Sequence, residues 1–474
     1  MSKIKTITPS LEDIFLPEDA LDKLKSLIQG DVLLPTDSEY DDARKIWNGM
    51  IDKCPALIVR CTGSADVIDA VKFAREHNLL VSVRGGGHNV AGNALCDDGM
   101  VIDLTKMKGI HLDLKSNTAR AQAGVTLGEL DRETQMFGLS VPSGIVTTTG
   151  IAGLTLGGGF GYISRKYGLS IDNLISVDMV TAEGEFLTAS KTENEDLFWG
   201  LRGGGGNFGI VTSFEYQLQE IGPIVLGGML LHPISDAREF LRFYRDFIAD
   251  APDELTVVPL LRLAPPAPFL PKELHGKPVV GIIVLYAGAI EKGETLIAPL
   301  RQYGTPLVDG IGPKPFRALQ SMLDTGAQPG WNYYVKSEFL PALSDELIDT
   351  LIEHASRITS PLSVIAGFHL GGAISNVDED ATAYSHRDAA YSLILNTTWI
   401  DPKESEKHIQ WTREFWKALQ PFSKGGAYIN FQSQDEGEDR VQTTYGSVKL
   451  KRLSLLKKKY DPLNFFRLNR NIKP

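Results

Sequence analysis

The residues best placed to do chemistry follow a short apolar strand, Val81 to Val83. Three consecutive glycines, Gly85 to Gly87, lead directly into His88. Glycine loses more chain entropy on folding than any other residue, so a run of glycines favours a loop in which backbone N–H groups approach a ligand closely or φ is positive. Phosphate is the usual ligand of such loops. A histidine at the edge of the loop can serve as a base, a ligand or a point of attachment.

Two further glycine clusters follow, in residues 142–161 and 202–211. Ordinary turns need one or two glycines each, so three clusters in this region predict a long polyanionic cofactor lying along the backbone. His88 and Asn89 stand where a G-x-G-x-x-G fingerprint would continue, and no P-loop pattern is present. ATP, or a nicotinamide on a standard Rossmann unit, is therefore not favoured.

The elements that must position these loops change along the chain. Residues 56–83 predict a βαβ unit, and the spacing of Thr126 and Glu129 predicts a capping box. The second half predicts an antiparallel sheet backed by helices, and the fold class is therefore α+β. Its expected strands are 224–231, 255–263, 279–286, 331–339, 362–370 and 391–400, and its expected helices are 236–249, 344–358 and 404–419. A basic helix over 445–459 ends before Asp461 and Pro462.

The composition limits the partners. A chain of 474 residues predicts two domains, and a net charge of −11 argues against duplex nucleic acid or an anionic membrane. The beginning of the chain lacks a signal-peptide pattern and no apolar run is long enough to span a bilayer, so we expect a cytoplasmic protein without a membrane partner. Cys54, Cys61 and Cys96 fit neither a disulfide framework nor a metal site, and we expect all three to be buried and no metal to be bound.

Five ordered motifs resemble a known family. They are residues 84–92, 153–161, 166–173, 207–211 and 460–467. Together they are similar to the FAD-linked oxidases related to berberine bridge enzyme and 6-hydroxynicotine oxidase, over roughly residue 35 to the end. The resemblance implies a bilobed protein. Its FAD-binding domain, of the vanillyl-alcohol oxidase or PCMH type, comprises residues 1–220, with a core at about 51–220. A substrate-binding domain comprises residues 221–424. The C-terminal segment, 425–474, returns to the FAD-binding domain.

The resemblance also implies which residues hold FAD. In this family the histidine at the place of His88 carries a covalent bond from the flavin 8α-methyl carbon, which raises the flavin reduction potential and holds the ring rigidly. The other expected cofactor residues are Arg84, Gly85, Gly86, Gly87, Asn89, Gly92, Pro142, Ser143, Gly144, Thr147, Thr149, Gly150, Gly153, Leu154, Gly158, Gly159, Tyr162, Asp172, Asn173, Gly209, Ile210, Val211, Tyr428 and Asn430. Many relatives have a second link from a cysteine, but that position falls on Val146, so we expect a single link through His88.

The sequence and the resemblance identify the catalytic residues less directly than the cofactor residues. Hydride transfer to flavin N5 needs a substrate C–H over the ring and usually a base. The family's tyrosine base falls on Phe431, which cannot take a proton. The candidates that remain are Tyr428, His369, and Tyr334 with Lys336. The last two share one face of a strand that in the family faces the ring.

The function expected from these residues is that of an FAD-dependent oxidoreductase. It would take a hydride from a CH–OH carbon of a sugar or alcohol, or from a CH–NH carbon, of a small-molecule substrate. We expect an oxidase with O₂ as electron acceptor, and Thr149 falls near the family's oxygen-access face. Two alternatives stay open: an FAD-linked dehydrogenase that reacts poorly with O₂, and a flavin-carrying binding protein without turnover.

Overall fold

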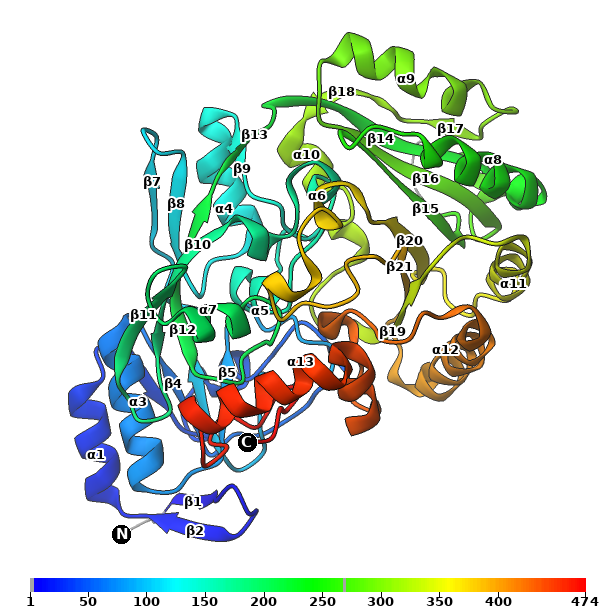
Figure 1. Cartoon of the computed structure of the whole chain (residues 1–474). Helices are drawn as coiled ribbons and strands as arrows, with labels where there is room; N and C mark the ends of the chain where they lie inside the picture. The colour runs from blue at the N-terminus through cyan, green and yellow to red at the C-terminus, as the bar shows by residue number, and fades with distance from the viewer. Residues whose placement is uncertain (1–3, 267–269) are drawn as a thin grey trace.

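The computed structural model describes residues 4–266 and 270–474 and shows two lobes (Figure 1). We call lobe 1 the elements from β1 to β13 together with the C-terminal helix α13, and lobe 2 the elements from β14 to α12. Within the described ranges no helix is both long and apolar enough to cross a membrane.

Lobe 1 begins with a mixed four-stranded sheet in the order β3-β4-β6-β5. The strands are β3 (Asp31–Leu33), β4 (Leu57–Arg60), β5 (Val81–Arg84) and β6 (Met100–Asp103). Strands β4, β6 and β5 are parallel, as a βαβ crossover requires. Helix α3 (Ser64–Glu76) connects β4 to β5 and buries Val67, Ala70, Val71 and Ala74, which confirms the predicted apolar face.

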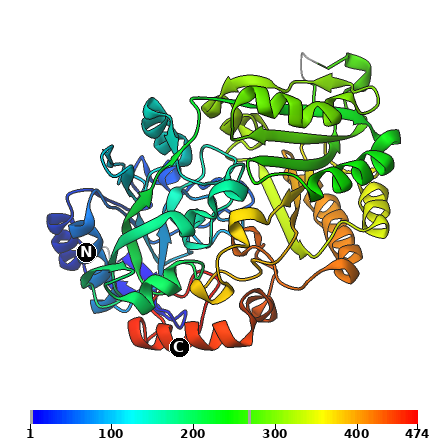
Figure 2. The same cartoon turned by 45° about the horizontal axis from the view of Figure 1, so that its top comes forward.

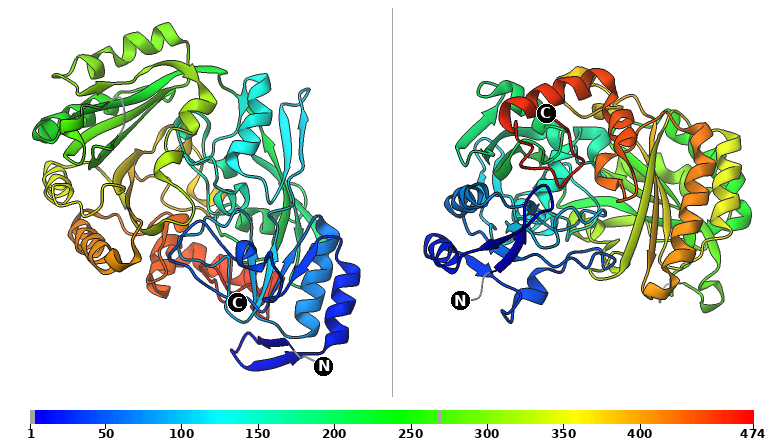
Figure 3. Two further views of the ribbon diagram at one scale, coloured as in Figure 1. Left: turned by 180° about the vertical axis from the view of Figure 1, so that it is seen from behind. Right: turned by 90° about the horizontal axis from the view of Figure 1, so that it is seen from below.

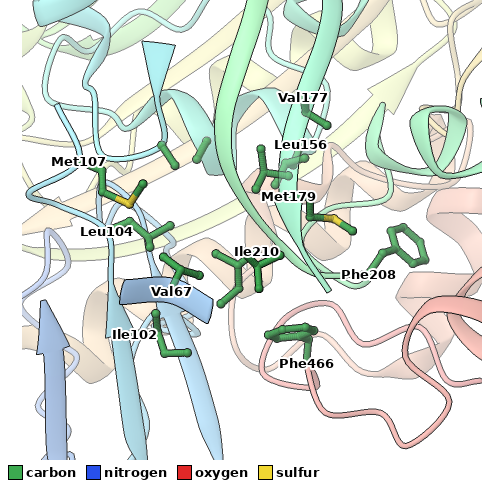
Figure 4. Close-up of a cluster of buried hydrophobic side chains, with 14 of the residues drawn as sticks. Val67, Ile102, Leu104, Met107, Leu156, Val177, Met179, Phe208, Ile210 and Phe466 are labelled. Carbon is green, nitrogen blue, oxygen red and sulfur yellow. The ribbon is translucent and has the colours of Figure 1, made fainter. Parts of the chain in front are cut away.

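A second sheet of lobe 1 is antiparallel, with the order β11-β10-β12-β8-β7. Its strands are β7 (Ile110–Asp113), β8 (Thr118–Gln122), β10 (Leu174–Val180), β11 (Phe186–Ser190) and β12 (Ile210–Gln217). The predicted capping box of Thr126 and Glu129 begins helix α4 (Leu127–Thr134). Apolar side chains from both sheets pack together, among them Ile102, Met179 and Ile210 (Figure 4).

Smaller elements complete lobe 1. They are β1 (Ile4–Ile7), β2 (Asp13–Leu16), α1 (Glu18–Leu27), α2 (Tyr40–Ala43), β9 (Leu139–Ser140), α5 (Ile151–Leu156), α6 (Ser164–Tyr167), α7 (Glu195–Leu201) and β13 (Gln219–Glu220). Cys61 and Cys96 are buried as expected, whereas Cys54 is exposed, so the prediction for Cys54 is wrong. Its segment, 51–54, is irregular, and its residues are exposed or half-buried.

Lobe 2 is built on an antiparallel sheet in the order β17-β14-β16-β15-β20-β21-β19, with β18 also paired to β14. The strands are β14 (Ile224–Pro233), β15 (Leu255–Leu263), β16 (Pro278–Tyr286), β17 (Val308–Asp309), β18 (Gly312–Pro315), β19 (Asn332–Leu340), β20 (Val364–His369) and β21 (Tyr391–Trp399). The six long strands lie within two residues of the predicted ranges. The α+β class and the antiparallel sheet are therefore confirmed.

The two faces of this sheet have different neighbours. Helices α8 (Ala237–Ala249), α11 (Asp345–Ala355) and α12 (Ser405–Leu419) cover the face that points away from lobe 1, with α9 (Ile290–Gln302) at one end (Figures 1 and 3). We call this the outer face; Leu261, Ile365 and Leu395 pack there. The opposite, inner face packs against lobe 1 and α10 (Phe316–Gln320) through a separate apolar cluster.

The C-terminal segment returns to lobe 1 and lies along it (Figure 2). Helix α13 (Glu438–Tyr460) is interrupted at Gly446, where φ is 69°, so it consists of two helical pieces. The ammonium group of Lys457 is fully buried and donates to the Asp461 carboxylate and to the carbonyls of Asn207 and Phe466. The same carboxylate accepts from the amides of Phe465 and Phe466, which fixes the turn after the helix.

Candidate flavin-binding site

Two of the glycine clusters touch each other through their backbones. A Cβ atom at Gly86 would lie 2.4 Å from the Cα of Gly150, and one at Gly150 would lie 2.5 Å from the amide nitrogen of Gly86. Gly87 and Gly92 have φ of 68° and 73°, a conformation that favours glycine. The close contact between the two loops is thus one reason why glycines are needed after β5.

The same loops offer a row of free donors. Among the described residues, none accepts a hydrogen bond from the backbone N–H groups of residues 85–91. Helix α5 begins directly after Gly150 without a side-chain cap, and a Cβ at Gly153 in its first turn would meet open space. Unpaired N–H groups at a glycine loop and a helix start bind anions. The loops therefore fit a cofactor with a diphosphate such as FAD.

His88 is held at the edge of this loop. Its Nε2 lies 2.9 Å from the Thr148 hydroxyl, and its Nδ1 lies 3.4 Å from the Thr149 hydroxyl. Its ring stacks on Trp47 with centroids 4.8 Å apart, and Trp47 stacks in turn on Tyr333 with centroids 3.5 Å apart. Burial lowers the pKa of His88 to about 3, so the imidazole is neutral at pH 7 and one of its two nitrogens carries a lone pair instead of a proton.

Sequence reasoning missed Trp47 and its neighbour Asn48. The Trp47 indole donates to the carbonyl of Ala327, and the Asn48 amide bonds to the backbone of Val90 and Tyr333. Both residues therefore connect lobe 1 to lobe 2 beside His88. They lie in a segment without a glycine motif or a repeated pattern, so no local signal pointed to them.

Tyr428 and Asn430 lie against the second glycine cluster. The Tyr428 hydroxyl accepts from the amide of Gly159 at 2.9 Å and from Nδ2 of Asn430 at 2.8 Å. Burial raises the pKa of Tyr428 to about 12. Gly158 has φ of 127°, and a Cβ there would lie 2.7 Å from the Tyr384 ring. The second glycine cluster therefore leaves room for the rings of both Tyr384 and Tyr428.

The structure contradicts the expected direction of Tyr334 and Lys336. Lys336 Nζ lies 2.9 Å from Asp435 and 3.2 Å from Glu436 and sits over the Trp416 ring of α12, so it faces the outer side. The Tyr334 hydroxyl donates to Asp435 at 2.7 Å.

The alternation along β19 holds, but the pair facing lobe 1 is Tyr333 and Val335. Which set of alternate residues faces outward is set by the carboxylates of the returning tail, because they hold the buried Lys336 ammonium on the outer side. Placing Tyr334 and Lys336 at the flavin was therefore wrong.

His369 also lies on the outer side. Its Nδ1 lies 2.9 Å from the guanidinium of Arg165, and its ring packs against Tyr391. Burial and the Arg165 charge lower the pKa of His369 to about 4. Its neighbour Phe368 takes the inner face and meets Phe160. The expectation of an inward-facing His369 was wrong because strand alternation gives that side to Phe368.

Several expected cofactor residues are bonded to the protein instead. Asp172 accepts two hydrogen bonds from Arg387, at 2.7 and 3.1 Å, and the Asn173 amide donates to the carbonyls of Tyr167 and Leu169. The amide and hydroxyl of Thr147 both donate to Asp324 of lobe 2. These side chains hold loops in place, and the contact of Asp172, Asn173 and Thr147 with the cofactor stays a prediction.

The remaining expected residues divide by location. Arg84 donates to the carbonyl of Ala43, and its Nε is buried without a partner in the described chain; the same holds for the Tyr162 hydroxyl. Unpaired buried polar atoms of this kind fit a site completed by a cofactor. The others are placed as follows. Asn89 accepts from the amide of Asn93, the Pro142 carbonyl accepts from Ser170, and Ser143 and Gly144 accept from Gln320. Leu154 is half-buried, Gly209 directly precedes β12, and Ile210 and Val211 begin that strand beside β10.

Comparisons with known proteins agree with this site. Residues 55–190 match the FAD binding domain family, and residues 427–473 match the berberine and berberine-like family. The chain is 33% identical over 462 residues to (R)-6-hydroxynicotine oxidase of Paenarthrobacter nicotinovorans, covering 94% of this chain and 97% of that protein. It is 32% identical over 452 residues to an FAD-linked oxidoreductase of Dictyostelium discoideum, covering 94% and 95%.

Solved structures show the same architecture. 6-Hydroxy-D-nicotine oxidase from Arthrobacter nicotinovorans superposes with a TM-score of 0.85 at 29% identity, covering 94% of this chain and 98% of that one. Physcomitrella patens BBE-like 1 gives 0.84 at 25% identity, covering 96% and 99%. The fold and the site define an FAD-dependent oxidoreductase. More particularly, the chain belongs to the family of FAD-linked oxidoreductases that includes (R)-6-hydroxynicotine oxidase and the berberine-bridge-enzyme-like proteins.

Proposed function

We propose that this protein is an oxidase that takes a hydride from a CH–OH or CH–NH carbon of a small organic substrate and holds its FAD by one covalent bond through His88. When bound, FAD supplies the hydride acceptor. The observation that carries the proposal is the position of His88. A neutral imidazole is held between Trp47 and two threonine hydroxyls at the edge of the contacting glycine loops.

The chain offers one nucleophile at this place. The unprotonated nitrogen of His88 is suited to bond formation because burial keeps the ring neutral. Val146 has no nucleophilic atom. Cys61 and Cys96 are buried in lobe 1, and Cys54 is exposed to solvent. We therefore propose a single link.

Tyr428 is the residue that we propose to hold or move the substrate proton. Phe431 packs edge-on against Tyr428, with centroids 4.9 Å apart, and cannot itself carry a proton. The Tyr428 oxygen accepts two hydrogen bonds, and no described residue accepts its own proton. Because its pKa is raised to about 12, the phenol is protonated at pH 7 and acts first as a hydrogen-bond donor.

The covalent link is tested by acid precipitation of the FAD-loaded protein. We expect the yellow colour to stay in the wild-type pellet and to move to the supernatant in His88→Ala. His77→Ala is the matched control, because His77 lies at the end of α3, outside the loops, and this variant should keep its flavin. Release of all FAD from the wild type, or a flavin peptide attached at any residue other than His88, contradicts the proposal.

Turnover and oxygen use need separate measurements. Anaerobic bleaching of the flavin with panels of alcohols, sugars and amines identifies the reacting carbon. A flavin that photoreduces normally but is bleached by no substrate would favour the binding-protein alternative. Stopped-flow mixing of reduced protein with O₂ distinguishes the oxidase from the dehydrogenase, for which slow reoxidation is expected. A cytoplasmic location is part of the proposal and rests on the sequence alone.

A further inference from the structure

The inner face of the lobe 2 sheet is lined mainly by apolar side chains and a few small hydroxyls, and near its middle it carries a guanidinium and an amide side by side. The strand register places five residues in one row across it: Val279, Arg262, Val364, Asn396 and Val335. The next row contains Leu260, Ala366, Ile394 and Ser337, and the first three belong to or pack against the inner apolar cluster. Leu261 and Leu395 pack on the outer face, so strand alternation turns Arg262 and Asn396 inward.

Arg262 carries a charge that the described chain does not balance. Its Nε donates to the carbonyl of Leu263 at 3.1 Å, and no described carboxylate lies within ion-pair distance of it. Its two terminal nitrogens have no hydrogen-bond partner among the described residues, yet neither is closed off from solvent. By contrast, the buried Arg387 is paired with Asp172. A half-buried guanidinium against an apolar wall normally requires an anion.

Asn396 also lacks a partner. Its side chain makes no hydrogen bond within the described residues, and its Oδ1 is buried. Only Val364 separates it from Arg262 in the row, which puts the two Cβ atoms about 10 Å apart at ordinary strand spacing. The side chains of Arg262 and Asn396 can therefore both reach one small molecule lying over Val364.

The row lies between the two ends of the site. Along β19, Tyr333 precedes Val335 by two residues and stacks on Trp47, which stacks on His88. Along β20, Phe368 lies beyond Ala366 and meets Phe160, whose ring packs against Tyr428. Figure 1 shows β15, β20, β21 and β19 on the side of lobe 2 that faces lobe 1. Arg262 and Asn396 thus belong to the wall opposite the flavin loops.

We infer that Arg262, assisted by Asn396, binds a carboxylate of the substrate, so that the substrate is a small organic acid with an apolar body. The guanidinium presents two parallel N–H donors that match a carboxylate, and the surrounding apolar side chains strengthen that attraction. An unmodified sugar would leave most of its hydroxyls against Val364, Ala366 and Ile394, and a cationic amine would be repelled by Arg262. The oxidation of such an acid rests on the proposed function, whereas its binding does not.

The test uses benzoate as the probe and benzamide as its neutral partner. Binding to the FAD-loaded protein is followed by calorimetry and by the change in flavin absorbance. We expect the wild type to bind benzoate at least tenfold more tightly than benzamide. Arg262→Gln should remove this preference, Arg262→Lys should keep part of it, and Asn396→Leu should weaken binding by a smaller factor. Arg238→Gln is the matched control, because Arg238 is exposed on α8 and pairs with Asp349.

The outcomes separate this inference from the proposed function. Equal binding of benzoate by the wild type and by a folded, FAD-loaded Arg262→Gln overturns the carboxylate site, as does a wild-type preference for benzamide. If benzoate binding depends on Arg262 but no acid, alcohol, sugar or amine bleaches a flavin that photoreduces normally, the site stands and the oxidase proposal fails. If neutral alcohols bleach the flavin with a higher kcat/KM than the matching hydroxy acids, and Arg262→Gln leaves both values unchanged, the oxidase stands and the acid substrate is overturned.

Discussion

At the scale of single residues, the glycines after β5 have two roles. The sequence indicated a close approach of backbone to a ligand, and the structure shows a close approach of Gly86 to Gly150 as well. The free N–H groups of residues 85–91 are available only because the two loops are held together. The contact between the loops is therefore a condition for binding the cofactor.

Gly86→Ala tests this contact. The new Cβ would lie 2.4 Å from backbone atoms of Gly150, which cannot rotate away, so the two loops must separate. We expect a loss of about 3 kcal/mol in the free energy of unfolding, together with reduced FAD content. Urea unfolding of the FAD-free protein and the ratio of flavin to protein absorbance measure the two effects. Gly312→Ala, in strand β18 where a Cβ meets nothing within 4 Å, should match the wild type in both; normal FAD content in Gly86→Ala would contradict the interpretation.

At the scale of elements, a cluster of buried charges fastens the returning tail to β19. Lys336 pairs with Asp435 and Glu436, and the buried Glu338 accepts from Arg440 at 2.5 Å. A charge removed from water must be paired, so these residues fix both the register of the tail and the direction of the β19 side chains. Their function is to position elements, which is why an apparent Tyr–Lys catalytic pair lies away from the flavin loops.

The cluster predicts a specific sensitivity to acid. Burial alone would raise the pKa of Asp435, but hydrogen bonds from Lys336 and Tyr334 lower it to about 2, below the value of about 4 for an unfolded chain. Because the folded pKa is the lower one, the stabilisation is complete above about pH 4 and is lost as the pH falls toward 2. Asp435→Asn should therefore be less stable than the wild type at pH 6 and should lose less additional stability between pH 4 and pH 2.

Urea unfolding at a series of pH values measures both slopes. Asp439→Asn is the matched control, because Asp439 is an exposed residue of the same tail and should reproduce the wild-type slope. Equal slopes for Asp435→Asn and the wild type would mean that Asp435 does not hold the tail in the way described.

At the scale of the whole molecule, a set of polar contacts joins the lobes beside the site. Asn48 donates to the carbonyls of Val90 and Tyr333 and accepts from the Tyr333 amide, all between 2.9 and 3.0 Å. Thr147 is joined to Asp324 from the other lobe. Both contacts lie within one or two residues of groups that touch His88, so the spacing of the lobes and the position of the histidine are set together.

Asn48→Ala should loosen this joint. Removal of the side chain leaves buried backbone groups of Tyr333 and Val90 without a partner, and we expect a loss of about 3 kcal/mol. The stacking of Tyr333 on Trp47 should become less ordered, so covalent flavin content should fall as well. Thermal unfolding and acid precipitation measure these effects. Asn376→Ala, at an exposed position of lobe 2, should change neither, and an unchanged Asn48→Ala would contradict this role.

The sequence by itself determined the features that depend on neighbours along the chain. Helix and strand periodicity, the Thr126 and Glu129 capping box, the glycine clusters and the Asp461-Pro462 ending are local patterns, and together they gave the α+β class, the family and FAD as the cofactor. Strand ranges in lobe 2 were predicted to within two residues for the same reason, because turn residues and apolar alternation are read locally.

The tertiary structure alone decided which face each strand turns toward the site and which charges are paired. Alternation divides the residues of β19 and β20 into two sets, but the side that faces lobe 1 depends on distant partners: the carboxylates at 435 and 436 for Lys336, and Arg165 for His369. The stack of Trp47 on His88 and the unbalanced charge of Arg262 likewise exist only once remote segments meet. Such choices are made by packing and desolvation across the fold, and a local pattern carries no information about them.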